Sequence, residues 1–306
     1  MSSRQVDGYE VHIVDGHVEL PVGVTKIGDP TFATPASFSD FRDPREKNMD
    51  GYAFASCASL KSITIPSTVT DICPFAFFRC ESLTSVIIPS SVTDIGLAAF
   101  KGCTSLMSVT IPSSVTTIRG CAFSNCSSLI SVAIPSSLTE IEEGAFQNCL
   151  SLKSVTIPSS VTEIEACMFL GCHNLTLVTI PSSITKLIKG TFLYCLSLTS
   201  VAIPSSVTEI DTQTFTECAI TAITIPTTCT LRPLAFDTKV TIIRLTPDRM
   251  EFCYRLATFV RWRHALKFCK PQLFAWYERA ALKSGSFSSE GAGRKRDIEA
   301  FERDFA

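Results

Sequence analysis

Long apolar runs are absent from this sequence. None of its 306 residues belongs to a run of about 18 consecutive apolar residues, which is the length that a membrane-spanning helix requires. The N-terminal stretch MSSRQVDGYEVHIVDGHVEL also lacks the apolar segment that follows a basic start in a secretory signal. These two absences predict a cytoplasmic protein, and an extracellular or cell-surface location is the alternative.

Recognisable sets of catalytic residues are also missing. Only four histidines occur, and the sequence shows no glycine-rich phosphate loop, no acid pair and no complete set of metal ligands. Cys172 and His173 are adjacent, but catalytic partners are brought together by the fold and not by adjacency. We therefore expect no enzyme, no catalytic residue, no cofactor and no metal.

Acidic and basic residues are distributed unevenly along the chain. Residues 1–238 carry 13 Lys and Arg against 21 Asp and Glu, whereas residues 239–306 carry 14 against 8. The net charge of −2 conceals this break, which marks a basic C-terminal segment.

Cysteine is abundant, with 14 residues, and most of the cysteines follow a strict period. Eight of them stand 23 residues apart, and each has a phenylalanine three positions before it. A fixed period in the twenties indicates a solenoid, in which each repeat packs on its neighbours. The periodic cysteines are Cys57, Cys80, Cys103, Cys126, Cys149, Cys172, Cys195 and Cys218.

One repeat contains two extended segments. In SVTIP (154–158), apolar and hydroxyl side chains alternate with the period of a β-strand, so Val155 and Ile157 are expected to face the core. The proline closes that strand because it has no amide hydrogen to donate. VTEI (161–164) predicts a second, short and bent extended segment, and a turn of helix or 3₁₀ helix is expected around EACMF (165–169). Stacked repeats then pair the SVTIP-type strands into a parallel sheet.

The repeat resembles the BspA-type leucine-rich repeat. The resemblance is carried by LTSVIIPSSVTDIGLAAFKGC (83–103) and its copies, and it covers roughly residues 51–226. It implies a right-handed solenoid used for adhesion or protein binding. The expected fold is therefore a β-rich leucine-rich-repeat solenoid with short turns or helical segments and a C-terminal helical cap.

The two ends of the chain depart from the repeat. VELPVGVTKIGDPTF (18–32) keeps its spacing and predicts a degenerate first repeat, and Thr246 followed by Pro247 is typical of a helix start. The expected domains are an N-terminal cap with an inserted loop (1–50), the solenoid (51–246), a basic helical cap (247–284) and a flexible tail (285–306).

The periodic cysteines allow several interpretations. A nucleophile needs a polar, electropositive setting, whereas these thiols have phenylalanine and leucine as sequence neighbours. The spacing from Cys121 to Cys126, and from Cys167 to Cys172, occurs in some zinc sites, but no second ligand pair follows. Disulfides between repeats about 4.8 Å apart are not excluded by the Cα distance, although parallel side chains leave the Cβ atoms slightly too far apart. We favour the interpretation that each periodic cysteine is a small, buried hydrophobic side chain.

The outward positions of the main strands form a flat surface of small side chains. It lacks the Trp, Tyr and Arg residues that usually anchor a partner, so we expect a broad and weak interaction. The candidate partner-binding residues on it are Ser85, Ile87, Ser108, Thr110, Ser131, Ser154, Thr156 and Leu177, and Ser200 and Ala202 continue the series. The other extended segment carries an acidic line that keeps the solenoid soluble or faces a basic partner: Asp71, Asp94, Glu140, Glu163 and Glu209.

FCYRLATFVRWRHALKFCK (252–270) predicts a basic amphipathic helix. Such a helix caps an open last repeat, or it binds an anionic membrane or a calmodulin-like groove. Its candidate contact residues are Arg261, Trp262, Arg263 and Lys267.

The function that we expect from these patterns is a monomeric, intracellular, non-catalytic scaffold. Its partner is an unknown protein, and no nucleic acid is expected. A secreted or cell-surface BspA-like adhesin is the first alternative, and peripheral membrane or calmodulin-like binding through the basic helix is the second.

Overall fold

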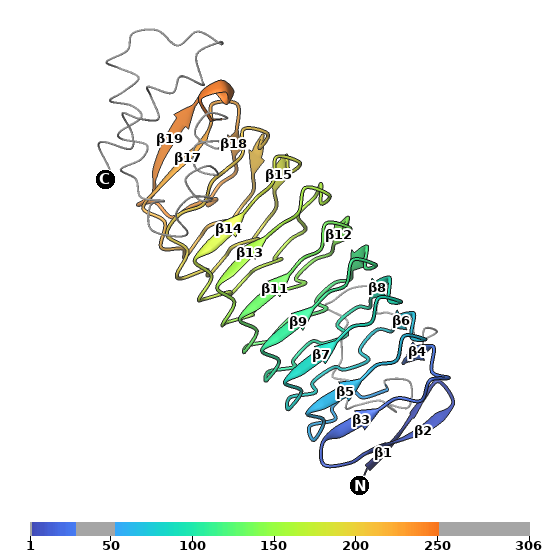
Figure 1. Ribbon diagram of the computed structural model, residues 1–306. Helices are drawn as coiled ribbons and strands as arrows, with labels where there is room; N and C mark the ends of the chain where they lie inside the picture. The colour runs from blue at the N-terminus through green and yellow to red at the C-terminus, as the bar shows by residue number, and fades with distance from the viewer. Residues whose placement is uncertain (1, 29–52, 251–306) are drawn as a thin grey trace, which may run out of the picture.

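The computed structural model describes residues 2–28 and 53–250, which form an elongated solenoid of stacked turns (Figure 1). Each repeat makes one turn, here called a rung, and successive rungs lie side by side along the solenoid axis (Figure 1). Three walls enclose the core. Two are built from β-strands and the third from tight turns.

The first wall is a parallel sheet of seven strands whose hydroxyl-bearing residues face outward. Ser131 lies in register with Ser108 on one side and with Ser154 on the other, so equivalent residues of successive rungs line up. Val109 is buried, whereas its neighbours on either side are exposed, which confirms the predicted alternation. The strands are β3 (His17–Glu19), β5 (Ser62–Thr64), β7 (Ser85–Ile87), β9 (Ser108–Thr110), β11 (Ser131–Ala133), β13 (Ser154–Thr156) and β14 (Leu177–Thr179).

The next strand of this series was predicted at residues 200–202 and does not form. A single bridge between Thr179 and Ala202 continues the pairing there. Parallel pairing resumes in the last two rungs, where β17 (Ala222–Pro226) pairs with β19 (Thr241–Leu245). The predicted last strand at 240–245 is thereby confirmed within one residue.

The second wall consists of two-residue strands in two parallel sheets, as expected for VTEI-type segments. The first sheet holds β4 (Lys26–Ile27), β6 (Asp71–Ile72), β8 (Asp94–Ile95), β10 (Thr117–Ile118) and β12 (Glu140–Ile141). The second holds β15 (Lys186–Leu187), β16 (Glu209–Ile210) and β18 (Thr230–Leu231).

The second wall is interrupted at Glu163, where the sequence predicted another extended segment. Residues 161–165 form no strand, so the ladder stops at β12 and restarts at β15. Glu163 would stand in register beside Glu140, and like charges that oppose each other directly destabilise a sheet. Asp71 and Asp94 also pair in register in this wall, but there Arg119 forms an ion pair with Asp94. Neither Glu140 nor Glu163 has an ion-pair partner among the described residues, and Lys186, in the rung after Glu163, pairs with Glu209.

The third wall contains no helix in the described residues, so the prediction of a helical turn at 165–169 is wrong. Two residues of that rung, Cys167 (φ 56°) and Gly171 (φ 72°), adopt the left-handed conformation, which interrupts a helix. The backbone N–H groups point along the solenoid axis instead. The amide of Phe169 donates to the carbonyl of Thr191 in the next rung, at 2.9 Å. A third ladder of hydrogen bonds thus joins the rungs.

The core is built from identical side chains stacked on each other. Phe123 is fully buried between Phe100 and Phe146, with ring centroids 5.3 and 5.5 Å away. Along the whole column, neighbouring rings are 5.0 to 5.7 Å apart and nearly parallel. Because each rung buries its apolar face only against the next one, the stack stabilises all rungs together.

The N-terminal end begins with an antiparallel hairpin that the sequence analysis missed. β1 (Ser2–Val6) and β2 (Tyr9–Ile13) are joined by Asp7 and Gly8, which both have positive φ. The Asp-Gly pair is a recognised signal for such a turn. Val6, Val11 and Ile13 join the core. β3 and β4 pair with β5 and β6, so the segment from His17 to Ile27 stacks on the next rung.

The C-terminal end shows only the start of the predicted helix. Residues 247–250 form its first turn, in which the amide of Met250 donates to the carbonyl of Thr246 at 2.9 Å. The remainder of the basic cap, the flexible tail and the inserted loop lie outside the described residues. Within the part that is described, no helix is long and apolar enough to cross a membrane.

Candidate partner-binding surface

The periodic cysteines lie inside the solenoid and point at backbone carbonyls. The Cys149 thiol is fully buried and donates to the carbonyl of Phe123 at 3.2 Å. The same bond, between a cysteine and the phenylalanine 26 residues before it, recurs at 3.0 to 3.3 Å from Cys80 to Cys218. Cys57 differs, because its sulfur accepts a hydrogen bond from Arg4.

Burial controls the acidity of these thiols. It raises the pKa of Cys126 to about 12 and that of Cys172 to about 12, and it holds the pKa of Cys149 well above its usual range. At neutral pH the thiols are therefore protonated. Since the thiolate is the form that attacks substrates and binds metals, the column is not suited to either task.

Metal binding finds no support in the spatial arrangement. Cys126 belongs to the main core, whereas Cys121, five positions earlier, lies outside it on the third wall. Burial raises the pKa of Cys121 to about 11. Among residues 2–28 and 53–250, no three His, Cys, Asp or Glu side chains gather in a way that could hold a metal ion.

The structure brings together most of the residues predicted to bind a partner. Ser85, Ile87, Ser108, Thr110, Ser131, Ser154 and Thr156 are exposed on the outer face of the seven-stranded sheet, and Leu177 is partly exposed at its last strand. Between β5 and β13, the outward positions carry no charged side chain. Arg261, Trp262, Arg263 and Lys267 lie outside the described residues.

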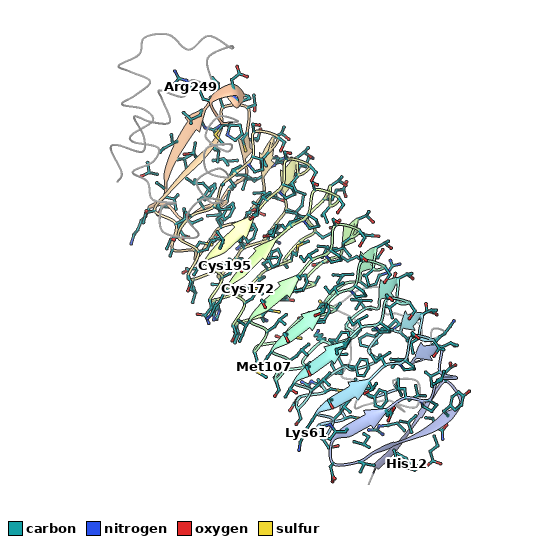
Figure 2. All side chains as sticks on the ribbon, in the orientation of Figure 1. His12, Lys61, Met107, Cys172, Cys195 and Arg249 are labelled. Carbon is teal, nitrogen blue, oxygen red and sulfur yellow. The ribbon has the colours of Figure 1, made fainter. Side chains whose placement is uncertain are left out.

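The sequence analysis missed a line of side chains beside this face. Each strand is preceded by a residue that follows the buried leucine. In the five rungs from β5 to β13 these residues are Lys61, Thr84, Met107, Ile130 and Lys153, here called the rim column, and Thr176 takes the same position before β14. From Thr84 onward, each amide donates to the carbonyl of the preceding member at 3.0 to 3.1 Å, which keeps the five in line. Lys61 and Met107 project from the same edge of the solenoid (Figure 2).

The rim column has exposed apolar side chains at its centre. Met107 is 51% exposed and Ile130 is 44% exposed, and Ile87 on the adjoining sheet face reaches 78%. The sequence did contain a signal for this apolar patch. Met107 and Ile130 replace the threonine that stands at the same position in other rungs, such as Thr84 and Thr176. A search for the shared repeat pattern averages such differences away.

The second wall has a different electrostatic character. Arg119 forms ion pairs with Asp94 at 3.0 Å and Glu142 at 2.9 Å, and these hydrogen bonds raise its pKa above the ordinary value. Glu209 is held between Lys186 and Arg232, and the hydrogen bond from Arg232 lowers its pKa most. Exposed pairs of this kind contribute little stability. The two strand walls therefore present one charged surface and one nearly neutral surface.

Comparison with known proteins identifies the repeat. The family model described as the BspA type leucine rich repeat region matches residues 16–130, 47–176 and 121–243. A comparison with curated proteins gives no match.

Solved structures of leucine-rich repeat proteins are similar to the chain over part of its length. A leucine-rich repeat protein of T. pallidum is 37% identical over 45% of this chain and 67% of its own, with a TM-score of 0.44. A leucine-rich cell surface protein of Faecalibacterium prausnitzii is 23% identical over 80% of this chain and 77% of its own, with a TM-score of 0.46. Because the family model covers most of the solenoid, the chain belongs to the BspA-type leucine-rich repeat family.

Proposed function

We propose that this protein is a non-catalytic binding protein of the adhesin type, which acts at the cell surface or after secretion and binds another protein. The observation that carries the proposal is the outer face of the seven-stranded sheet, an uninterrupted exposed surface without charge between β5 and β13. A repeated flat surface of this kind suits an extended partner, because each rung adds an equivalent area of contact. Membership of the BspA-type family supports the adhesin role.

The cysteines do not favour an intracellular location once their surroundings are known. A high count of free thiols suggests a reducing compartment only if the thiols are able to react. Here seven of the eight periodic cysteines are buried and Cys218 is partly buried, and burial raises their pKa values, so they resist oxidation in either compartment. The cytoplasmic scaffold is the competing proposal. Binding to a membrane or a calmodulin-like protein through Arg261 and Trp262 stays a prediction.

Labelling of intact cells tests the location. A membrane-impermeant biotin reagent reacts with exposed lysines such as Lys61, Lys153 and Lys186, which lie on the solenoid surface. We expect the protein in native cells to be labelled without permeabilisation, whereas a cytosolic control protein is labelled only after it. Labelling that requires permeabilisation would support the cytoplasmic scaffold instead.

A further inference from the structure

The rim column combines exposed apolar side chains with cationic ones. Its centre exposes the apolar side chains of Met107 and Ile130, and its two ends carry the ammonium groups of Lys61 and Lys153. Neither lysine has an ion-pair partner among the described residues, in contrast to Lys186 on the second wall. The pattern is therefore cation, threonine, two apolar residues, cation.

The spacing of these groups is set by the backbone ladder. Adjacent members of the column are joined by hydrogen bonds, so they are about 4.8 Å apart, the separation of paired strands. Lys61 and Lys153 are four rungs apart, which places their Cα atoms about 19 Å from each other. An extended chain advances about 3.3 Å per residue, so six residue steps cover this distance.

We propose that the rim column binds an extended, acidic segment of a partner protein, with two carboxylates about six residues apart and two apolar side chains between them. The carboxylates lie at Lys61 and Lys153, and the apolar side chains cover Met107 and Ile130. Charge complementarity selects this partner, because an acidic segment is repelled from the carboxylate-rich second wall around Glu140 and attracted to the lysines. The inference rests on the proposed function and gives its partner a chemical class.

A short synthetic peptide provides the probe. In Glu-Ser-Leu-Ser-Leu-Ser-Glu, alternate residues share one face of an extended chain, so the two Glu and the two Leu side chains all face the column. We expect the methyl resonances of Met107 and Ile130 in the labelled full-length protein to shift on titration with this peptide. We expect Lys-Ser-Leu-Ser-Leu-Ser-Lys to bind at least tenfold more weakly.

Variants taken from the repeat itself keep the fold intact. In Met107→Thr and Ile130→Thr, the new residue is the one that Thr84 already provides at this position. Each should weaken the peptide about tenfold, because a half-exposed apolar side chain is no longer covered. Lys61→Thr together with Lys153→Thr should remove most of the salt dependence of binding. The matched control is Leu196→Ser, which removes another exposed apolar residue, outside the column, and should leave binding unchanged.

Several outcomes would overturn the proposal. They are equal binding of the two peptides, unchanged binding by the threonine variants, and methyl shifts that appear without peptide as the protein is concentrated, which would indicate a second copy as the occupant. Shifts caused by phosphatidylserine vesicles but not by the peptide would indicate a membrane. Each of these results concerns the rim column alone, whereas the proposed function is tested separately by surface labelling.

Discussion

Replacement of one central phenylalanine tests whether the stack of rings holds the rungs together. Phe123 has no exposed surface and contacts a ring on each side, at 5.3 and 5.5 Å. In Phe123→Ala, the lost burial costs about 1.5 to 3 kcal/mol, and each lost ring pair adds about 0.5 to 1.5 kcal/mol. We therefore expect the free energy of unfolding to fall by about 4 kcal/mol, within the range of about 3 to 5 kcal/mol typical of buried Phe→Ala changes.

Phe236→Ala is the matched control at the end of the same stack. Phe236 is 9% exposed, and among the described rings it is stacked on Phe215 alone, at 5.1 Å. This variant should lower the free energy of unfolding by about 2 kcal/mol, because only one ring pair is lost and neighbouring side chains can relax into the space left at the end of the stack. Urea unfolding followed by far-ultraviolet circular dichroism measures both variants.

The central change should also affect cooperativity. Coupling between rungs passes through neighbours only, so a weak rung in the middle separates two halves that then unfold in two transitions. If Phe123→Ala costs no more than Phe236→Ala and unfolding stays a single transition, the rings do not couple the rungs. The three backbone ladders would then carry the cooperativity by themselves.

Three further changes test other parts of the fold. Burial raises the pKa of Cys126 from 9.0 to about 12, so the stability that depends on keeping this thiol protonated is complete below pH 9 and is lost as the pH rises towards 12. In urea titrations across this range, the free energy of unfolding should decline less steeply for Cys126→Ser than for the unchanged protein. An equal decline would contradict the raised pKa. Glu163→Thr removes the carboxylate beside Glu140 and should stabilise the protein by about 0.5 kcal/mol, with Glu165→Thr as an exposed control that has no such effect. Gly144→Ala should lower the stability measured by thermal unfolding by about 1 to 2 kcal/mol, because Gly144 has φ +62° and a Cβ there would lie 3.0 Å from the Cys121 sulfur. The same change at Gly8, where nothing lies within 4 Å, measures the cost of the backbone conformation alone. Equal losses of stability at both positions would exclude a contribution from the contact with Cys121.

The core and the first wall as far as β14 followed directly from the sequence, whereas the strand expected at residues 200–202 is reduced to a single bridge. Their residues recur with a period of 23, and the alternation of Val109 with its exposed neighbours is a local property of an extended chain. Stacking identical rungs leaves little choice of register, since equivalent residues must lie above each other. The N-terminal hairpin was missed although Asp7 and Gly8 signalled its turn, because the repeat pattern does not reach that segment.

The third wall and the interruption of the second could not be read from the same pattern. Cys167 adopts a left-handed conformation, and its amide donates a hydrogen bond to the carbonyl of Lys189 in the neighbouring rung, which the sequence of one repeat does not reveal. The break at Glu163 depends on which cation pairs with which carboxylate, and Lys186 pairs with Glu209. Such competition involves residues from several rungs at once.

By itself, the sequence determined the rung: its length, its two extended segments, its apolar face and the column positions of phenylalanine and cysteine, because these are properties of one repeat and its copies. Only the tertiary structure decided what the copies do to one another. Stacking placed Met107 beside Ile130 between two lysines, turned the amides of the third wall along the axis and surrounded Cys149 with core. The physical reason is that each of these features arises between rungs, where residues 23 positions apart become neighbours.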